Sequence, residues 1–235
     1  MLDTKFWQKY FLQYDALNNL IPYQELLAGI RDALGDDARG NLLDLGSGTG
    51  NVCMFLGDSF DEKHGIDSSQ VGIDIHNTKE QGVMLCHADI TEPLPYEDEY
   101  FNVVVSNNVL YTIDPAKRDQ LLKQVYRILK PGGKFVVSNL TIGFKPGKIY
   151  LDHIKKSLKR KGLFRTVHEL LVLLKPTVLI LYYNYLIRKE DKSGQYGFFT
   201  PGEQEALLRD AGFTIVHPEQ DHYYAKGAAL ITGLK

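Results

Sequence analysis

The feature that most constrains this chain is a glycine-rich turn after a short apolar run: residues 42–51 are Leu-Leu-Asp-Leu-Gly-Ser-Gly-Thr-Gly-Asn. A buried strand that ends in such a turn brings backbone N–H groups close to a ligand, because no Cβ obstructs the approach. Gly50 follows Gly48 by two positions, whereas the dinucleotide fingerprint places its third glycine three positions on. Asp44, two residues before Gly46, is also foreign to that fingerprint. The spacing therefore argues against a nicotinamide-dinucleotide site and an oxidoreductase built on it.

Strand-like and helix-like segments alternate along most of the 235 residues, which predicts an α/β fold with a Rossmann-like, doubly wound, mostly parallel sheet. We expect its parallel strands at 41–45, near 65–67, and at 83–87, 101–106 and 134–138. Two further strands, 213–216 and 228–232, have no helix between them and should complete a seven-stranded sheet as an antiparallel edge hairpin. Helices are expected at the N-terminus, after Gly50, at 117–129 and from about residue 201.

We treat residues 1–235 as one domain with four parts: an N-terminal helical cap (1–37), a cofactor-binding core (38–140), a helical insertion or lid after the fifth strand (141–200), and a C-terminal helix with the edge hairpin (201–235). The insertion is rich in lysine and arginine over 145–165 and continues with two apolar runs, 170–174 and 178–183, each too short to span a bilayer. Three interpretations stay open: a lid over an apolar substrate, a surface that docks on an anionic membrane or a partner, or packed helices with a solvated charged face.

Ligands of open parallel sheets bind at the C-terminal ends of the strands, and four segments of this sequence fall there. The first is the glycine loop with Asp44, and the second is Asp67, which follows the loop by about 20 residues, as a ribose-binding acid does. The third is Asp89 with Ile90, where a carboxylate can accept a hydrogen bond from an adenine amino group and a backbone N–H can reach a ring nitrogen. The fourth, residues 106–111, follows the fourth strand, where we expect the substrate to meet the reactive part of the cofactor.

A second acid competes with Asp67, because residues 71–74 also resemble a strand end that carries a carboxylate. If Asp74 held the ribose, only about 15 residues would separate it from Asp89, which is short for a helix, a strand and two turns. We therefore favour Asp67 as the ribose-binding acid.

The order of these motifs along the chain is also that of a known protein family. The D-x-G-x-G-x-G pattern of residues 44–50, the two later acids and the Leu-Lys-Pro-Gly-Gly-Lys segment at 129–134 resemble class I S-adenosylmethionine (SAM)-dependent methyltransferases of the type 11/25-like, small-molecule subgroup. The resemblance covers residues 38–140 closely and the hairpin at 223–232 in outline, and it implies SAM as cofactor with S-adenosylhomocysteine (SAH) as product. In the family the glycines contact the methionine part, the first acid lies near its ammonium group, and the later acids bind ribose and adenine. By this resemblance the cofactor-binding residues are Asp44, Gly46, Ser47, Gly48, Gly50, Asp67, Ser68, Asp89, Ile90 and Ser106.

The implied reaction is in-line displacement at the sulfonium methyl, where alignment of the reactants supplies a large share of the acceleration. An oxygen nucleophile would also need a base. The candidate catalytic residues, among which the sequence does not choose, are Tyr111, His153, His168 and His222. Residues 106–109 are Ser-Asn-Asn-Val rather than the Asn-Pro-Pro-Tyr or Asp-Pro-Pro-Tyr of enzymes that methylate amino groups of nucleobases or glutamine. No paired acid and asparagine pattern for a divalent metal is evident, so we expect no metal.

The expected acceptor is therefore a small molecule, bulky or apolar, with a lipid or membrane-associated acceptor as one alternative and a non-catalytic SAM-fold binding or scaffold protein as another. The net charge of −2 gives no basic field for nucleic acid, and no nucleic-acid partner is expected. Peripheral membrane contact through residues 145–188 stays open, and the oligomeric state is not predicted. Residues 1–14 carry no signal pattern, which predicts a cytoplasmic location.

The sequence also supports expectations for the N-terminal aromatic residues, for the residues after the fourth strand and for the two cysteines. The N-terminal aromatic residues recur at three- and four-residue steps, as either a helix-packing stripe or a substrate lid: Phe6, Trp7, Tyr10, Phe11 and Tyr14. Tyr111 is either a substrate contact or a core residue, and Asn107 and Asn108 are expected to shape the pocket floor. Cys53 and Cys86 are too few for a disulfide framework and are expected in the core.

Overall fold

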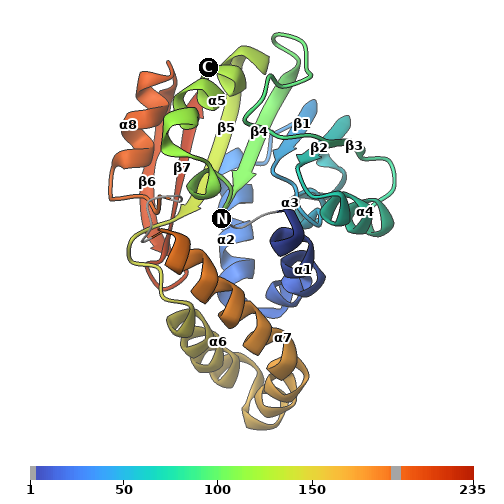
Figure 1. The fold of residues 1–235 in the computed structure, drawn as a ribbon, viewed down its shortest axis with the longest axis vertical. Coiled ribbons are helices and arrows are strands. Elements are labelled where there is room, and N and C mark those ends of the chain that lie inside the picture. Colours follow the sequence, from blue (N-terminus) through green and yellow to red (C-terminus); the bar gives the residue numbers. More distant parts are fainter. Residues whose placement is uncertain (1–3, 192–196) are drawn as a thin grey trace.

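The computed structural model describes residues 4–191 and 197–235, and a seven-stranded sheet lies at its centre (Figure 1). The strands are β1 (Asn41–Leu45), β2 (Glu62–Asp67), β3 (Met84–His87), β4 (Phe101–Asn107), β5 (Leu129–Leu140), β6 (Thr214–Tyr223) and β7 (Ala228–Leu234). Their order is β3-β2-β1-β4-β5-β7-β6, with parallel pairing from β3 to β5 and antiparallel pairing of β7 with both β5 and β6. This arrangement confirms the predicted doubly wound α/β sheet with its antiparallel C-terminal edge hairpin.

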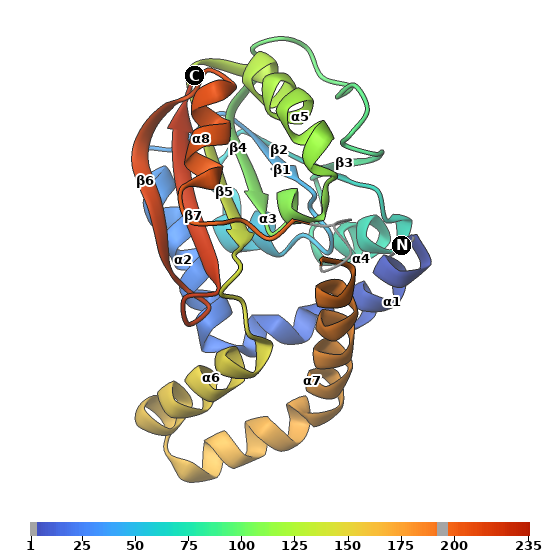
Figure 2. The same ribbon diagram turned by 60° about the vertical axis from the view of Figure 1, so that its left-hand side comes forward.

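Helices cover both faces of this sheet. They are α1 (Thr4–Tyr14), α2 (Ile21–Leu34), α3 (Asn51–Leu56), α4 (Gln70–Lys79), α5 (Pro115–Ile128), α6 (Pro146–Lys161), α7 (Leu163–Asp191) and α8 (Glu203–Asp210), with short 3₁₀ turns η1 (Asp15–Asn19), η2 (Gly57–Ser59) and η3 (Leu110–Thr112). In Figure 2, α5 and α8 lie on one face and α2 lies on the other. The N-terminal helices and the helical insertion after β5 are therefore present as predicted.

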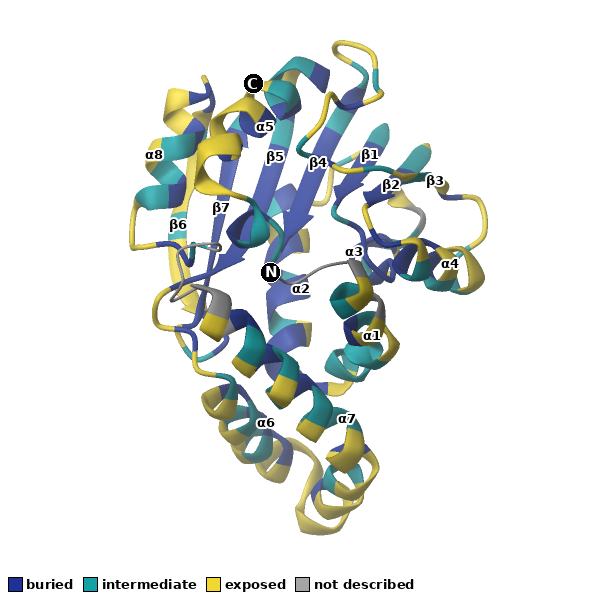
Figure 3. Cartoon of the chain, in the orientation of Figure 1, coloured by how far each residue is buried: buried dark blue, intermediate teal, exposed yellow. Residues whose placement is uncertain are grey.

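The central strands are apolar on both faces, as a parallel sheet between two helical layers requires. Leu42 and Leu43 of β1 and Val104 and Val105 of β4 are all fully buried. Figure 3 shows the central strands in the colour of buried residues, whereas much of the outer surface of α6 and α7 is exposed. The close-packed sheet fixes the positions of the strand ends, where the predicted site residues lie.

The fifth strand begins earlier than predicted, because the Pro-Gly-Gly segment lies inside the strand rather than before it. Leu129 pairs with Phe101, and Lys134 pairs with Val103, so the intervening residues bulge out of the ladder. Pro131 has no N–H to donate to a ladder, which makes a bulge the place in a strand where it is tolerated.

The structure excludes the alternative in which residues 71–74 end a strand. They lie within α4, which begins after Ser69, whose side chain accepts a hydrogen bond from the Gly72 N–H at 3.3 Å. Asp74 is exposed on this helix and accepts a hydrogen bond from Gln70, whereas Asp67 ends β2.

The two apolar runs of the insertion are not separate segments, which corrects the expectation that each is too short to span a bilayer. Both belong to α7, which carries Pro176 in its interior and changes direction along its length (Figure 2). Within the described residues, its stretch Leu163–Ile187 is the one helix long and apolar enough to cross a membrane by length and composition. Only 22% of its most apolar window is buried, so this is not an ordinary core helix.

Candidate active site

One open pocket lies where β1, β2 and β4 end, beneath α1, the base of α6 and the end of α7. The space between its lining residues is about 1220 Å³, a volume that includes open solvent at its mouth. Eight of the ten residues predicted to bind the cofactor line it, namely Asp44, Gly46, Ser47, Gly48, Asp67, Ser68, Asp89 and Ile90. The topology thus brings three separate strand ends to one cavity, as open parallel sheets do.

Asp44 is the chemically most unusual group in the pocket. Its side chain is 1% exposed, and its Oδ2 atom has no hydrogen-bond partner in the structure. Burial, together with a smaller effect of the nearby carboxylate of Asp67, raises the pKa of Asp44 to about 7, while hydrogen bonds from Cys53 act in the opposite direction. None of the described residues that line the pocket is a lysine, arginine or histidine. A cationic ligand group would therefore supply the charge that this buried carboxylate lacks.

Asp67 joins the end of β2 to the glycine loop. Its Oδ2 accepts a hydrogen bond from the Gly48 N–H at 2.9 Å, and its Oδ1 accepts one from the Ser69 N–H at 2.8 Å. Burial raises the pKa of Asp67, and these two hydrogen bonds partly oppose that rise. The carboxylate is thus fixed in orientation beside the loop, in the position from which a strand-end acid can accept from ribose hydroxyls.

The loop after β3 contributes the third acid. Asp89 is exposed at the rim of the pocket, and its Oδ1 accepts a hydrogen bond from the Thr91 N–H at 2.8 Å. Ile90 beside it is buried and gives the pocket an apolar wall. A flat heterocycle could lie against Ile90 with its polar edge toward Asp89.

A side chain at Gly48 would strain the backbone and would also meet a neighbouring aromatic ring. Its φ is +50°, and a Cβ at this position would lie 2.8 Å from Cε1 of Phe11. Phe11 belongs to α1, so the N-terminal helix packs directly on the loop.

Two predicted cofactor-binding residues, Gly50 and Ser106, do not line the pocket. Gly50 precedes α3 with φ +79°, and a Cβ there would lie 2.1 Å from Cδ2 of His76, so its role is to let that ring pack beneath the loop. Ser106 is fully buried within the sheet and donates a hydrogen bond to the Leu45 carbonyl at 3.2 Å. Strand β4 continues one residue beyond the prediction, and Asn107 and Asn108 line the pocket instead.

The three candidate histidines lie outside the pocket, which corrects their nomination as catalytic bases. His153 is buried, and its Nδ1 accepts a hydrogen bond from the Ile21 N–H at 3.2 Å, which ties α6 to the start of α2. His168 is exposed on α7, and His222 is exposed on β6, where its ring packs on Tyr223. Tyr111 is the one candidate that lines the pocket, although it is 4% exposed and also packs in the core.

An aromatic wall forms another part of the pocket. Trp7, Tyr10, Phe11 and Tyr14 of α1 all line it, so the N-terminal aromatic stripe both packs a helix and faces the cavity. Sequence periodicity found these residues, and Tyr111 was named separately as a possible substrate contact, whereas Tyr23, Phe144 and Tyr224 were not predicted. Burial raises the pKa of Tyr10, Tyr23 and Tyr224, so these hydroxyls stay protonated near neutral pH.

The N-terminal segment is hydrogen-bonded to the cofactor loop. The Asp15 carboxylate accepts from the Thr49 hydroxyl at 2.7 Å and pairs with Lys79 at 2.9 Å. Asn18 donates to the Asn51 side chain at 2.9 Å. These contacts hold the aromatic wall over the loop and close that side of the pocket.

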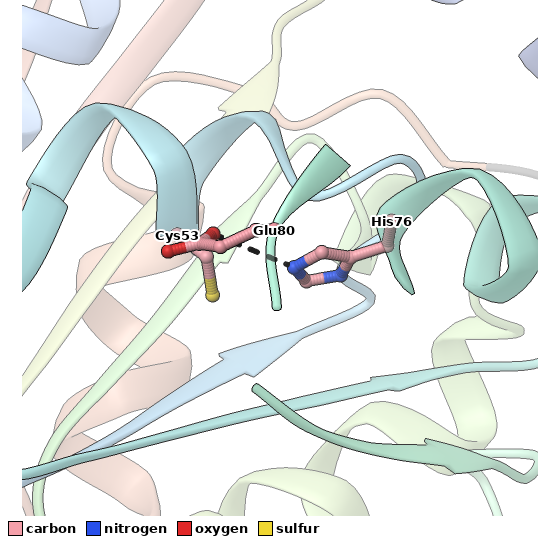
Figure 4. Close-up of side chains that lie close together, drawn as sticks. All are labelled: Cys53, His76 and Glu80. Atoms are coloured by element: carbon pink, nitrogen blue, oxygen red, sulfur yellow. Dashed lines mark ion pairs between the residues drawn. The ribbon is translucent and has the colours of Figure 1, made fainter. Parts of the chain in front are cut away.

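Beneath the loop, Cys53, His76 and Glu80 lie close together, with ligand atoms that are all within 4.8 Å of one another (Figure 4). Such donors can bind zinc. Lys63, however, already forms an ion pair with Glu80, and burial raises the pKa of the Cys53 thiol well above its usual range, which keeps Cys53 from being a thiolate. We therefore assign the cluster a packing role under Gly50.

Comparison with known proteins agrees with this geometry. Residues 43–137 match the family described as a methyltransferase domain. The chain is 31% identical over 137 residues to a demethylmenaquinone methyltransferase of Lactobacillus johnsonii, across 52% of this chain and 53% of that protein. It is 33% identical over 138 residues to a carboxy-S-adenosyl-L-methionine synthase of Helicobacter hepaticus, across 53% and 56% of the two chains. The chain thus spans about half the length of these curated relatives.

A solved structure is similar over nearly the whole chain. The DhpI–SAH complex superimposes with a TM-score of 0.60 at 17% identity, covering 98% of this chain and 93% of that one. At this identity the likeness shows the fold. Residues 43–137 therefore match a methyltransferase domain by sequence, and nearly the whole chain has the fold of the DhpI–SAH complex.

Proposed function

We propose that the protein transfers a methyl group from SAM to a small, largely apolar acceptor. The observation that carries this proposal is Asp44, a buried carboxylate with an unpartnered oxygen beside a glycine loop. Its surroundings fit SAM, which carries an ammonium group for Asp44, ribose hydroxyls for Asp67 and an adenine for Asp89. When bound, SAM supplies an electrophilic methyl group.

The chain's own contribution to the reaction is alignment and exclusion of water. Asp67 and the loop hold the cofactor end of the pocket, and the bonds of Asp15 and Asn18 keep the aromatic wall over it. Because the described lining contains no imidazole, the residues here are suited to an acceptor that arrives as a nucleophile, such as a neutral amine or an electron-rich ring carbon.

The aromatic wall supports a flat, apolar acceptor. Rings of Tyr10, Tyr14, Tyr111 and Tyr224 would contact a planar molecule face to edge, and their hydroxyls would donate to polar atoms on its rim. The similarity to a demethylmenaquinone methyltransferase makes quinol-like rings a reasonable first acceptor class.

The proposal is tested by incubating the protein with SAM carrying a labelled methyl group and a panel of acceptors. We expect label to appear on ring carbons of flat, apolar quinols and on apolar aromatic amines, and not in small polar amines and acids. Turnover restricted to the polar acceptors would overturn the proposed substrate class. Binding of SAM without turnover of any acceptor would favour the alternative of a non-catalytic SAM-fold protein.

A further inference from the structure

We propose that α6 and α7 dock the protein on an anionic lipid surface, through an apolar stripe on α7 and the basic residues around it. The stripe consists of Phe164, Val167, Leu171, Leu174, Val178 and Tyr185. They are spaced three, four or seven residues apart, which places these side chains on one face of the helix. Their exposed fractions run from 46% for Val167 to 91% for Phe164, so solvent reaches all of them.

The stripe is not the face with which α7 packs on the protein. Leu173, Ile180 and Ile187 are buried and lie on the opposite side of the helix, where they serve the core. Helix α7 thus has two apolar faces, and only the inner one is covered. Single exposed apolar residues are common on proteins, but a continuous row of this length marks a surface for a partner or a membrane.

The basic residues that neighbour the stripe in the sequence indicate what covers it. Between residues 155 and 175 the sequence carries seven basic side chains and one acidic one, Glu169. Glu169 is held by Lys161, at 2.8 Å, and by Ser157. Lys155, Lys159, Arg165 and Lys175 are exposed and form no ion pair with any described residue.

This combination favours an anionic bilayer over a second copy of the chain. Two copies that met through the stripe would bring their basic residues together, and like charges across an interface oppose association. A membrane with anionic headgroups instead accepts the apolar row between its acyl chains and pairs with the lysines around it. Because the inner face of α7 is packed on the protein, the helix would lie along the surface rather than cross it.

The same two helices connect this surface to the pocket. Ile149 near the start of α6 and Asn184 near the end of α7 line the cavity, while Leu163 and Phe164 lie where the two helices join (Figure 2). Docking would therefore bring the pocket near the lipid phase, from which an apolar acceptor could enter. This last step rests on the proposed function, whereas docking itself does not.

Sedimentation with vesicles tests the docking. We compare full-length protein on phosphatidylcholine vesicles with and without about 30 mol% phosphatidylglycerol. We expect at least about tenfold tighter binding to the anionic vesicles, weakened by added salt. The double variant Leu171→Glu/Leu174→Glu should reduce this binding at least about tenfold. Leu12→Glu, at a leucine of α1 with similar exposure (65% against 68% for Leu171), should bind like the wild type.

Two double variants that remove lysine charges separate the electrostatic contribution to docking from the apolar contribution. Lys159→Gln/Lys175→Gln should lower the preference for anionic vesicles, whereas Lys117→Gln/Lys123→Gln on α5 should not. Calorimetric binding of SAH, unchanged in all variants, would show that the pocket is intact and so distinguishes a failure of docking from a failure of the proposed function. Equal sedimentation with and without phosphatidylglycerol, or a dimer of the wild type that Leu171→Glu dissociates, would overturn the proposal.

Discussion

The Gly48 N–H donates a hydrogen bond to Oδ2 of Asp67 at 2.9 Å, and this contact joins the glycine loop of β1 to the end of β2. One carboxylate therefore orients the loop and presents an acceptor to the pocket at the same time. Replacement of Asp67 should disturb both ends of the cofactor site.

We predict that Asp67→Ala weakens SAH binding at least about tenfold, because it removes a partner of the loop and the proposed ribose acceptor. Asp74→Ala is the matched control, since Asp74 is an exposed acid on α4 only seven residues later in the chain. Calorimetry should show near wild-type affinity for the control. A larger loss in Asp74→Ala than in Asp67→Ala would contradict the assignment.

Binding of SAH should depend on pH through Asp44. Its pKa of about 7 in the free protein means that the carboxyl is largely protonated at pH 6 and largely charged at pH 8. The ammonium group of SAH is favoured by the charged form, so affinity should rise with pH across this window and level off above it. Asp44→Asn should bind weakly with a flat profile. An affinity that falls as pH rises from about 6 to 8 would oppose the proposed pairing.

The same group should make the free protein less stable at higher pH. The folded pKa of Asp44 lies above its ordinary value of 3.8, so the folded state binds more protons between pH 4 and 7 and loses stability as pH rises through that range. Above pH 7 the penalty is complete and of the order of a few kcal/mol. Asp44→Asn should therefore raise the Tm of the ligand-free protein by several degrees at pH 8 and by less at pH 5. A Tm change of equal size at both values would refute this cause.

Gly50 should tolerate no side chain because of its neighbour as well as its backbone. Gly50→Ala places a Cβ 2.1 Å from the His76 ring, and we expect it to cost about 3 kcal/mol of unfolding free energy or more. Gly202 is the matched control, because it also precedes a helix with left-handed φ and has open space around it. Gly202→Ala should cost about 1–2 kcal/mol in the same denaturant titration. Adding His76→Ala should restore part of the stability of Gly50→Ala, and no recovery at all would exclude the clash as its cause.

The sheet and the acids of the site could be predicted from the sequence, because both follow from local patterns. The leucine-rich run before the glycine turn fixes where β1 stops, Asp67 is the last residue of β2, and parallel topology brings those ends together. Ser106 was misplaced because β4 runs one residue further, which moves Asn107 rather than Ser106 into the pocket. A shift of one residue changes which face a strand side chain occupies.

Contacts between segments far apart in the sequence could not be predicted from local sequence patterns. His153 appeared as a candidate base, but its ring is used to receive the Ile21 N–H across 132 positions of sequence. Tyr224 reaches the pocket through a turn in which residues 224–226 all have positive φ although none of the three is glycine, the residue that usually signals such a conformation. Helix α7 was divided in two because Pro176 usually ends a helix, whereas here the helix continues with a change of direction.

The most direct test of the account is calorimetric titration of the wild-type protein with SAH, with NADH as the control ligand. We expect SAH to bind with a dissociation constant in the micromolar range and NADH not to bind. Binding of NADH without binding of SAH would contradict it, because the loop, Asp44 and Asp67 would then serve a dinucleotide.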